Sequence, residues 1–118
     1  MIKIDKNISS FSTYSCQPKT KDELIEIINK RIIKEGSKCD LNDIDVSLIE
    51  DMSYLFRYSN FNGDISRWNT SNVKTMYRMF YWSPFNKDIS NWKINKDCDT
   101  FEMFTRCSIK EEYKPEIE

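Results

Sequence analysis

The sequence contains no histidine among its 118 residues. Histidine is the commonest general base, the usual partner of a catalytic serine or cysteine, and the commonest metal ligand. Only two glycines are present, Gly36 and Gly63, so the chain has no glycine-rich loop of the kind that holds a phosphate group. We therefore expect a protein that is not an enzyme and that binds no cofactor.

Metal chemistry also lacks its usual sequence signals. The four cysteines are spaced irregularly, at Cys16, Cys39, Cys98 and Cys107. No pair has the C-x-x-C spacing of zinc or redox sites, so we expect free thiols. The run from Asp43 to Ser47 resembles the start of a calcium loop, but Tyr54 occupies the twelfth position, where a bidentate glutamate is needed. No metal site is expected.

Long apolar runs are missing as well. No segment approaches the roughly 18 consecutive apolar residues of a membrane span, and the N-terminus lacks the apolar region of a secretory signal. The sequence therefore predicts a cytoplasmic protein without a membrane partner, or a surface protein if a signal has been removed. With 18 basic and 19 acidic side chains the net charge is −1, so direct binding of nucleic acid is not expected.

A repeat of 24 residues is the dominant feature that is present. Residues 52–68 are echoed by residues 76–92, and the register extends in both directions to give three copies: 39–62, 63–86 and 87–110. Equivalent positions carry similar side chains, as in the sets Phe56, Phe80 and Phe104, and Asp40, Asp64 and Asp88. Such self-similarity is typical of stacked units that share one core.

Two stretches of the repeat resemble a known family. Residues 68–80 read WNTSNVKTMYRMF, and residues 61–68 and 85–92 both follow the pattern F-N-x-D-I-S-x-W. This pattern resembles the BspA-like, leucine-rich-repeat-related repeat of bacterial surface proteins, over about residues 39–110. The resemblance implies non-enzymatic adhesion and interaction proteins, usually secreted and with many more copies.

Within each copy the local signals predict a strand, a short helix and a loop. Residues 64–70 have the β-branched and aromatic bias of a brief strand. Val73, Met76 and Met79 form the stripe of a short amphipathic helix. The predicted fold is thus an α/β repeat (solenoid): an N-terminal capping helix followed by three short strand-helix-loop repeats that form a small parallel sheet. The edges of that sheet offer a route to a homodimer.

The segment before the repeats differs from them. Residues 1–38 form an N-terminal unit in which Thr20 and Glu23 are spaced as a capping box. They begin a predicted helix over about residues 20–35, which Gly36 ends. We expect this helix to cover the first copy. Residues 1–15 fit either a strand or loose chain, and residues 111–118 fit an acidic, frayed tail. One compact domain results.

The repeated aspartates admit two interpretations. Asp64 and Asp88 are the obvious carboxylate pair to test for acid-base chemistry. They occupy equivalent positions of successive copies, however, and an aspartate there is better explained by hydrogen bonds to the amides of a turn. We expect the second.

Surface residues carry the functional hypothesis. The pairs that follow the predicted helix vary between copies and are rich in Tyr, Trp and Arg, the residue types that dominate interface hot spots. The predicted partner-binding residues are Tyr54, Tyr58, Tyr77, Arg78, Tyr81 and Trp82. The alternative is that they are merely half-buried at a corner of the repeat. A second candidate is an acidic patch, or a solvated face, in the first copy: Asp43, Asp45, Glu50 and Asp51.

Two functions follow from these observations. The first is a non-catalytic protein-protein interaction module that presents an aromatic and charged surface on a rigid repeat scaffold. The alternative is a small stand-alone inhibitor, of the kind that phages or mobile elements carry, which binds and sterically blocks a larger enzyme such as a defence nuclease. In both cases the partner is another protein.

Overall fold

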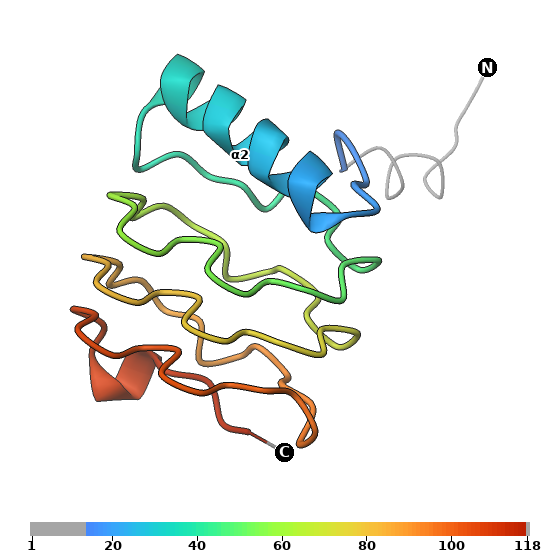
Figure 1. The fold of residues 1–118 in the computed structure, drawn as a ribbon. Coiled ribbons are helices and arrows are strands. Elements are labelled where there is room, and N and C mark those ends of the chain that lie inside the picture. Colours follow the sequence, from blue (N-terminus) through green and yellow to red (C-terminus); the bar gives the residue numbers. More distant parts are fainter. Residues whose placement is uncertain (1–13, 118) are drawn as a thin grey trace.

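The computed structural model describes residues 14–117. Among them are one α-helix, α2 (Lys21–Glu35), and one 3-10 helix, η1 (Glu111–Tyr113). Figure 1 shows α2 lying across one end of a stack of three layers of chain, with η1 at the other end. The prediction for residues 1–15 lies almost wholly outside the described residues. Within them, Cys16 forms a parallel bridge with Ile44.

Helix α2 begins at the predicted capping box. The Glu23 amide donates to Thr20 Oγ1 at 3.2 Å, and the Thr20 amide donates to Glu23 Oε1 at 3.2 Å. Gly36 ends the helix with φ of 95°. Leu24 and Ile28 on the inner face are buried, so the helix joins its apolar side to the core of the repeats.

The predicted α/β solenoid with a parallel sheet is wrong. The described residues contain no sheet, and the copies are joined by isolated parallel bridges at single residues. These bridges are Asp40 with Asp64, Asp51 with Thr75, and Thr75 with Asp99. The predicted homodimer depended on pairing between the edges of this sheet. Because the part of the chain that the structure describes has no sheet, it has no such edges.

Turns replace the predicted strands because side-chain oxygens bind the backbone amides. Asp64 Oδ1 accepts from the Ser66 amide at 2.9 Å, and Asp88 Oδ1 accepts from the Ser90 amide at the same distance. Asn69 does likewise for the Ser71 amide at 3.1 Å. These bonds bend the chain where a strand was expected, and they confirm that the repeated aspartates hold turns.

Overlapping turns replace the predicted helices. In the first copy the amides of Leu55, Arg57 and Ser59 donate to the carbonyls three residues before them. Tyr54 and Tyr58 interrupt this run with φ of 62° and 58°. The same two positions are left-handed in the next copies, at Arg78, Trp82, Glu102 and Arg106. A right-handed helix cannot pass through such residues.

The repeat register nevertheless decides which side chains meet in the core. The rings of Phe56 and Phe80 are 5.5 Å apart, as are those of Phe80 and Phe104. Trp68 and Trp92 stack at 6.3 Å with their planes 7° apart. Each indole also donates to a backbone carbonyl of the preceding copy, Trp68 to Leu41 and Trp92 to Ile65, both at 2.9 Å. The copies thus share one continuous core.

Candidate partner-binding surface

Aromatic side chains from the three runs of turns meet along one surface. Tyr54 packs edge-on against Tyr77 at 5.4 Å, Tyr77 stacks on Phe101 at 5.6 Å, and Tyr58 packs edge-on against Tyr81 at 6.0 Å. We call this surface the aromatic ridge, and it comprises Tyr54, Arg57, Tyr58, Tyr77, Arg78, Tyr81, Trp82, Phe101 and Arg106. All six predicted partner-binding residues belong to it.

Arginines connect these rings. The guanidinium carbon of Arg57 lies 4.5 Å from the Tyr54 ring centroid and 5.2 Å from that of Tyr58. Arg106 reaches back one copy and lies 5.0 Å from the Trp82 ring. A cation–π contact of this kind restrains both the arginine and the aromatic ring. The ridge is therefore an ordered surface.

Arg78 lies between two rings and an acid. It is 5.2 Å from the Tyr77 ring and 4.8 Å from the Tyr81 ring, and it donates through Nε to Glu102 Oε1 at 2.6 Å. The hydrogen bond to Glu102 raises the pKa of Arg78. Arg57 and Arg106 form no ion pair among the described residues, so no carboxylate there neutralises their charges.

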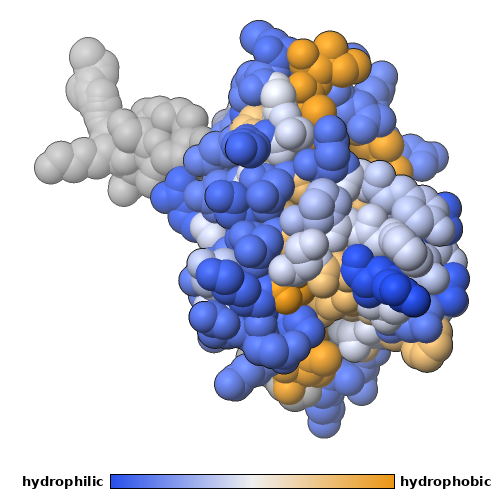
Figure 2. Space-filling view, turned by 90° about the vertical axis from the view of Figure 1, so that its left-hand side faces the viewer, coloured by the Kyte–Doolittle hydropathy of each residue, from blue (hydrophilic) through white to orange (hydrophobic). Residues whose placement is uncertain are grey.

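Much of the ridge is exposed. Tyr58 is 66% exposed, Phe101 57%, Trp82 49% and Tyr54 39%. Figure 2 shows the side on which the ends of the three copies lie, where a pale region of intermediate hydropathy adjoins hydrophilic side chains. Tyr77, Arg78 and Tyr81 are half-buried beneath their neighbours. The predicted set thus contains both exposed and supporting residues.

The backbone does not explain why these side chains are large. Tyr54, Tyr58, Arg78 and Trp82 all have φ between 49° and 62°. Glycine and asparagine adopt this conformation most readily, and for other residues it costs about 1 kcal/mol. Large side chains at strained, partly exposed positions add little to the core.

The set predicted from the sequence omits three members of the ridge: Arg57 and Arg106, which belong to the variable pairs already recognised, and Phe101. Each stands at a repeat position already represented in the predicted set, or directly beside one. Phe101 follows Tyr77 by one repeat, so extending that position into the third copy would have found it.

The predicted acidic residues lie elsewhere and have internal partners. Asp43 accepts from Arg31 at 2.8 Å and from Ser15 Oγ at 2.6 Å. Although partial burial opposes ionisation, these hydrogen bonds leave the pKa of Asp43 lowered. The other contacts are Asp45 with Gln17 at 2.9 Å, Asp51 with Lys21 at 3.6 Å, and Glu50 with Lys74 at 3.4 Å. Three of the four carboxylates thus hold the N-terminal segment or α2 to the first copy.

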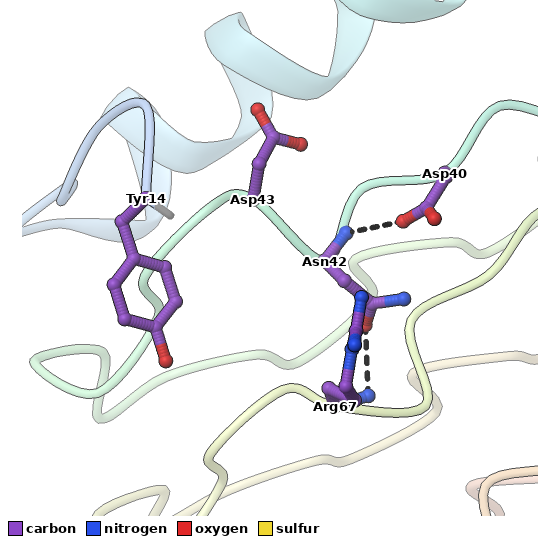
Figure 3. A pocket seen from close by; sticks show the side chains of 5 residues that line it. All are labelled: Tyr14, Asp40, Asn42, Asp43 and Arg67. Carbon is purple, nitrogen blue, oxygen red and sulfur yellow. Dashed lines mark hydrogen bonds between the residues drawn. The ribbon is translucent and has the colours of Figure 1, made fainter. Parts of the chain in front are cut away.

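A shallow pocket of about 470 Å³ lies beside Asp43 (Figure 3). Tyr14, Asp40, Asn42 and Arg67 complete its lining. The dashed lines in the figure join the Asn42 amide to Asp40 and the Arg67 amide to Asn42 Oδ1, both at 2.8 Å. Its polar groups therefore stabilise the turns of the first two copies.

Burial works against the activation of three of the four thiols. Burial raises the pKa of Cys39, Cys98 and Cys107, which disfavours the reactive thiolate. Residues 14–117 contain no group of three or more acidic or cysteine side chains placed to hold a metal ion. They also contain no helix long and apolar enough to span a bilayer.

These features define a repeat protein built from turns, with an aromatic surface along one side. A family model described as "Mycoplasma protein of unknown function, DUF285" matches residues 28–113, well over half of the chain. The protein belongs to this family. No curated protein and no solved structure matches it significantly.

Proposed function

We propose that the protein is a non-catalytic module whose aromatic ridge binds another protein. One observation carries this proposal: Tyr58 and Trp82 are large, 66% and 49% exposed, and placed where the backbone is left-handed. Tyr, Trp and Arg supply most of the binding energy in protein interfaces, since each buries a large area while keeping a polar group for hydrogen bonding.

The contacts within the ridge support binding. The cation–π and ring contacts fix the exposed rings before a partner arrives, so less side-chain entropy is lost on association. We also propose that the copies are repeats of the BspA-like type, which favours an adhesion or interaction role. The patterns shared by residues 61–68 and 85–92 support that assignment.

Photo-crosslinking tests the ridge directly. A benzophenone amino acid at position 58 would capture the partner from the source cells, and the captured protein would then be purified. Its affinity for the chain would be measured by calorimetry. The benzophenone at position 48 serves as a control, because Leu48 is 45% exposed and lies outside the ridge.

Alanine variants then decide the role of the ridge. We expect Trp82→Ala to weaken partner binding by roughly tenfold or more, as hot-spot truncations do. Leu48→Ala should change the affinity by no more than about twofold. Equal losses in the two variants would refute the proposed surface, and so would a loss of affinity that follows a falling melting temperature.

Trp82→Gly separates binding from folding. Glycine accepts the φ of 54° at this position without strain. The free energy of unfolding of the variant should therefore stay within about 1 kcal/mol of that of the natural chain. Its partner affinity should fall as far as that of Trp82→Ala. Phe80→Ala is the matched core variant, because Phe80 is fully buried and its truncation should cost about 3 to 5 kcal/mol.

A further inference from the structure

The backbone amides of residues 52–58 and 76–82 that bond to another copy all donate to the copy that follows. In the first copy, alternate amides donate to carbonyls 23 residues further along, at 2.8 to 3.0 Å. The pairs are Met52 with Thr75, Tyr54 with Tyr77, Phe56 with Met79, and Tyr58 with Tyr81. The second copy repeats the pattern toward the third at 2.7 to 3.0 Å, from Met76, Arg78, Phe80 and Trp82.

The intervening amides do not reach the next copy. Those of Leu55 and Arg57 donate within their own copy, to Met52 and Tyr54, and the second copy does the same from Met79 and Tyr81. Residues 76–82 therefore present N–H groups to the third copy and C=O groups to the first. Backward bonds occur just before the runs, where the Thr75 amide donates to Glu50 and the Asp99 amide to Lys74.

The third copy carries the same donor row. Among residues 14–117, the amides of Thr100, Glu102, Phe104 and Arg106 make no hydrogen bond. The C-terminal residues pair with another part of the copy: Ile89 donates to the Tyr113 carbonyl, and Ile94 bridges Ile117. We call residues 100–106 the donor edge.

Side chains along the donor edge are also incompletely packed. Phe56 and Phe80 are fully buried, whereas their equivalent Phe104 is only partly buried, with Lys114 Nζ 5.4 Å from its ring. Phe101 beside it is 57% exposed. A segment added at this edge would bury both rings and pair four amides at once.

We propose that the donor edge docks a run of turns of the same 24-residue type that lies outside residues 14–117. Such a run presents carbonyls at every second residue, in the register that the amides of residues 100–106 require. The internal contacts between copies show that this register pairs well twice already. Docking would extend the same ladder by one layer.

The polarity of the edge excludes symmetric self-association. Two chains meeting donor edge to donor edge would place N–H groups against N–H groups, with no acceptor between them. A homodimer through this edge therefore has no hydrogen bonds to form.

Head-to-tail stacking of two identical chains is blocked as well. The complementary carbonyl row belongs to the first copy, and α2 lies over that end of the stack (Figure 1). Lys21 Nζ of the helix donates to the Ser53 carbonyl at 3.0 Å, and Arg31 holds the helix to Asp43. The occupant is thus a repeat whose carbonyl edge no helix covers.

A peptide titration of the intact chain tests the proposal. The probe is a synthetic peptide with the sequence of residues 63–86, which supplies this carbonyl row inside the protein. Millimolar peptide should shift the amide resonances of Glu102, Phe104 and Arg106 and slow their exchange with solvent by roughly tenfold. A scrambled peptide should have no effect. Unchanged resonances at these three positions would refute docking, and so would their protection on concentrating the chain alone.

A backbone ester removes one donor without changing a side chain. Ligation at Cys98 allows an ester to replace the Phe104 amide in a synthetic C-terminal segment. We expect an unchanged melting temperature and an affinity for the peptide lower by about fivefold, the effect of one net hydrogen bond. The control ester at Thr105 removes an internal bond to the Glu102 carbonyl at 3.3 Å and should lower the melting temperature. Equal destabilisation by the two esters would show that the Phe104 amide is already paired, and would overturn the proposal.

Discussion

Gly63 approaches the backbone of Cys39 so closely that a Cβ at position 63 would stand 1.9 Å from the Cys39 carbonyl oxygen. It would also stand 2.9 Å from the carbonyl carbon. The same oxygen accepts from the Asp64 amide at 3.2 Å, so the two copies meet backbone to backbone. Gly63 does not have a positive φ, since only Gly36 among the glycines does. Space, rather than backbone freedom, requires glycine here.

Gly63→Ala should therefore lower the free energy of unfolding by about 3 kcal/mol, because neither backbone can move without breaking the contact between copies. Urea denaturation measures it. Two variants serve as controls. Gly36→Ala, where φ is 95° but space is open, should lower the free energy of unfolding by about 1 kcal/mol. Lys87→Ala, at the equivalent repeat position, should be nearly neutral. A Gly63→Ala loss no larger than that of Gly36→Ala would contradict the steric argument.

Aspartates that accept hydrogen bonds make the stability of the fold depend on pH. Hydrogen bonds from the Ser66 amide, Asn42 and the Ser66 hydroxyl lower the pKa of Asp64. The pKa values of Asp43, Asp45 and Asp51 are also lowered. For groups whose pKa is lower in the folded than in the unfolded chain, the stabilisation is complete above the unfolded value, about 3.9 for aspartate, and is lost as the pH falls below it. We expect a flat melting temperature between about pH 5 and 7 and a fall below about pH 4.

Asp64→Asn is the matched variant for this effect. Its amide oxygen can still accept from the Ser66 amide, but the group no longer titrates. The difference in melting temperature between about pH 6 and pH 3 should therefore be smaller than in the natural chain. Calorimetric scans at the two pH values measure it, and an undiminished difference would show that Asp64 does not contribute to the acid sensitivity.

Much of the packing could be predicted from the repeat. Because residues 24 positions apart play equivalent roles, the sequence alone predicts that Phe56, Phe80 and Phe104 align and that the six predicted partner-binding residues share a surface. The capping box of α2 was also recognisable, since Thr20 and Glu23 interact through local bonds. These features depend only on register and on short-range chemistry.

The backbone within each copy could not be predicted in the same way. The spacing of Val73, Met76 and Met79 suits a helix, but overlapping turns with a left-handed residue between them place the same side chains inward. Glycine would have signalled such turns, yet Arg78 and Trp82 occupy the left-handed positions. The donor edge could not be predicted from the sequence either, because it depends on backbone hydrogen bonds between copies and on no particular side chain.

Arg31 joins α2 to the first copy and provides the last prediction. It donates to both carboxylate oxygens of Asp43, at 3.0 and 2.8 Å, and to the Asp40 carbonyl at 2.9 Å. Both charged side chains are largely shielded, so Arg31→Met should cost about 1 to 2 kcal/mol in the free energy of unfolding and speed hydrogen exchange in α2. Lys30→Met is the control, since its pair with Glu26 is exposed and should contribute less than about 0.5 kcal/mol. Equal effects of the two variants on unfolding and on exchange would show that the Arg31–Asp43 pair does not hold the helix in place.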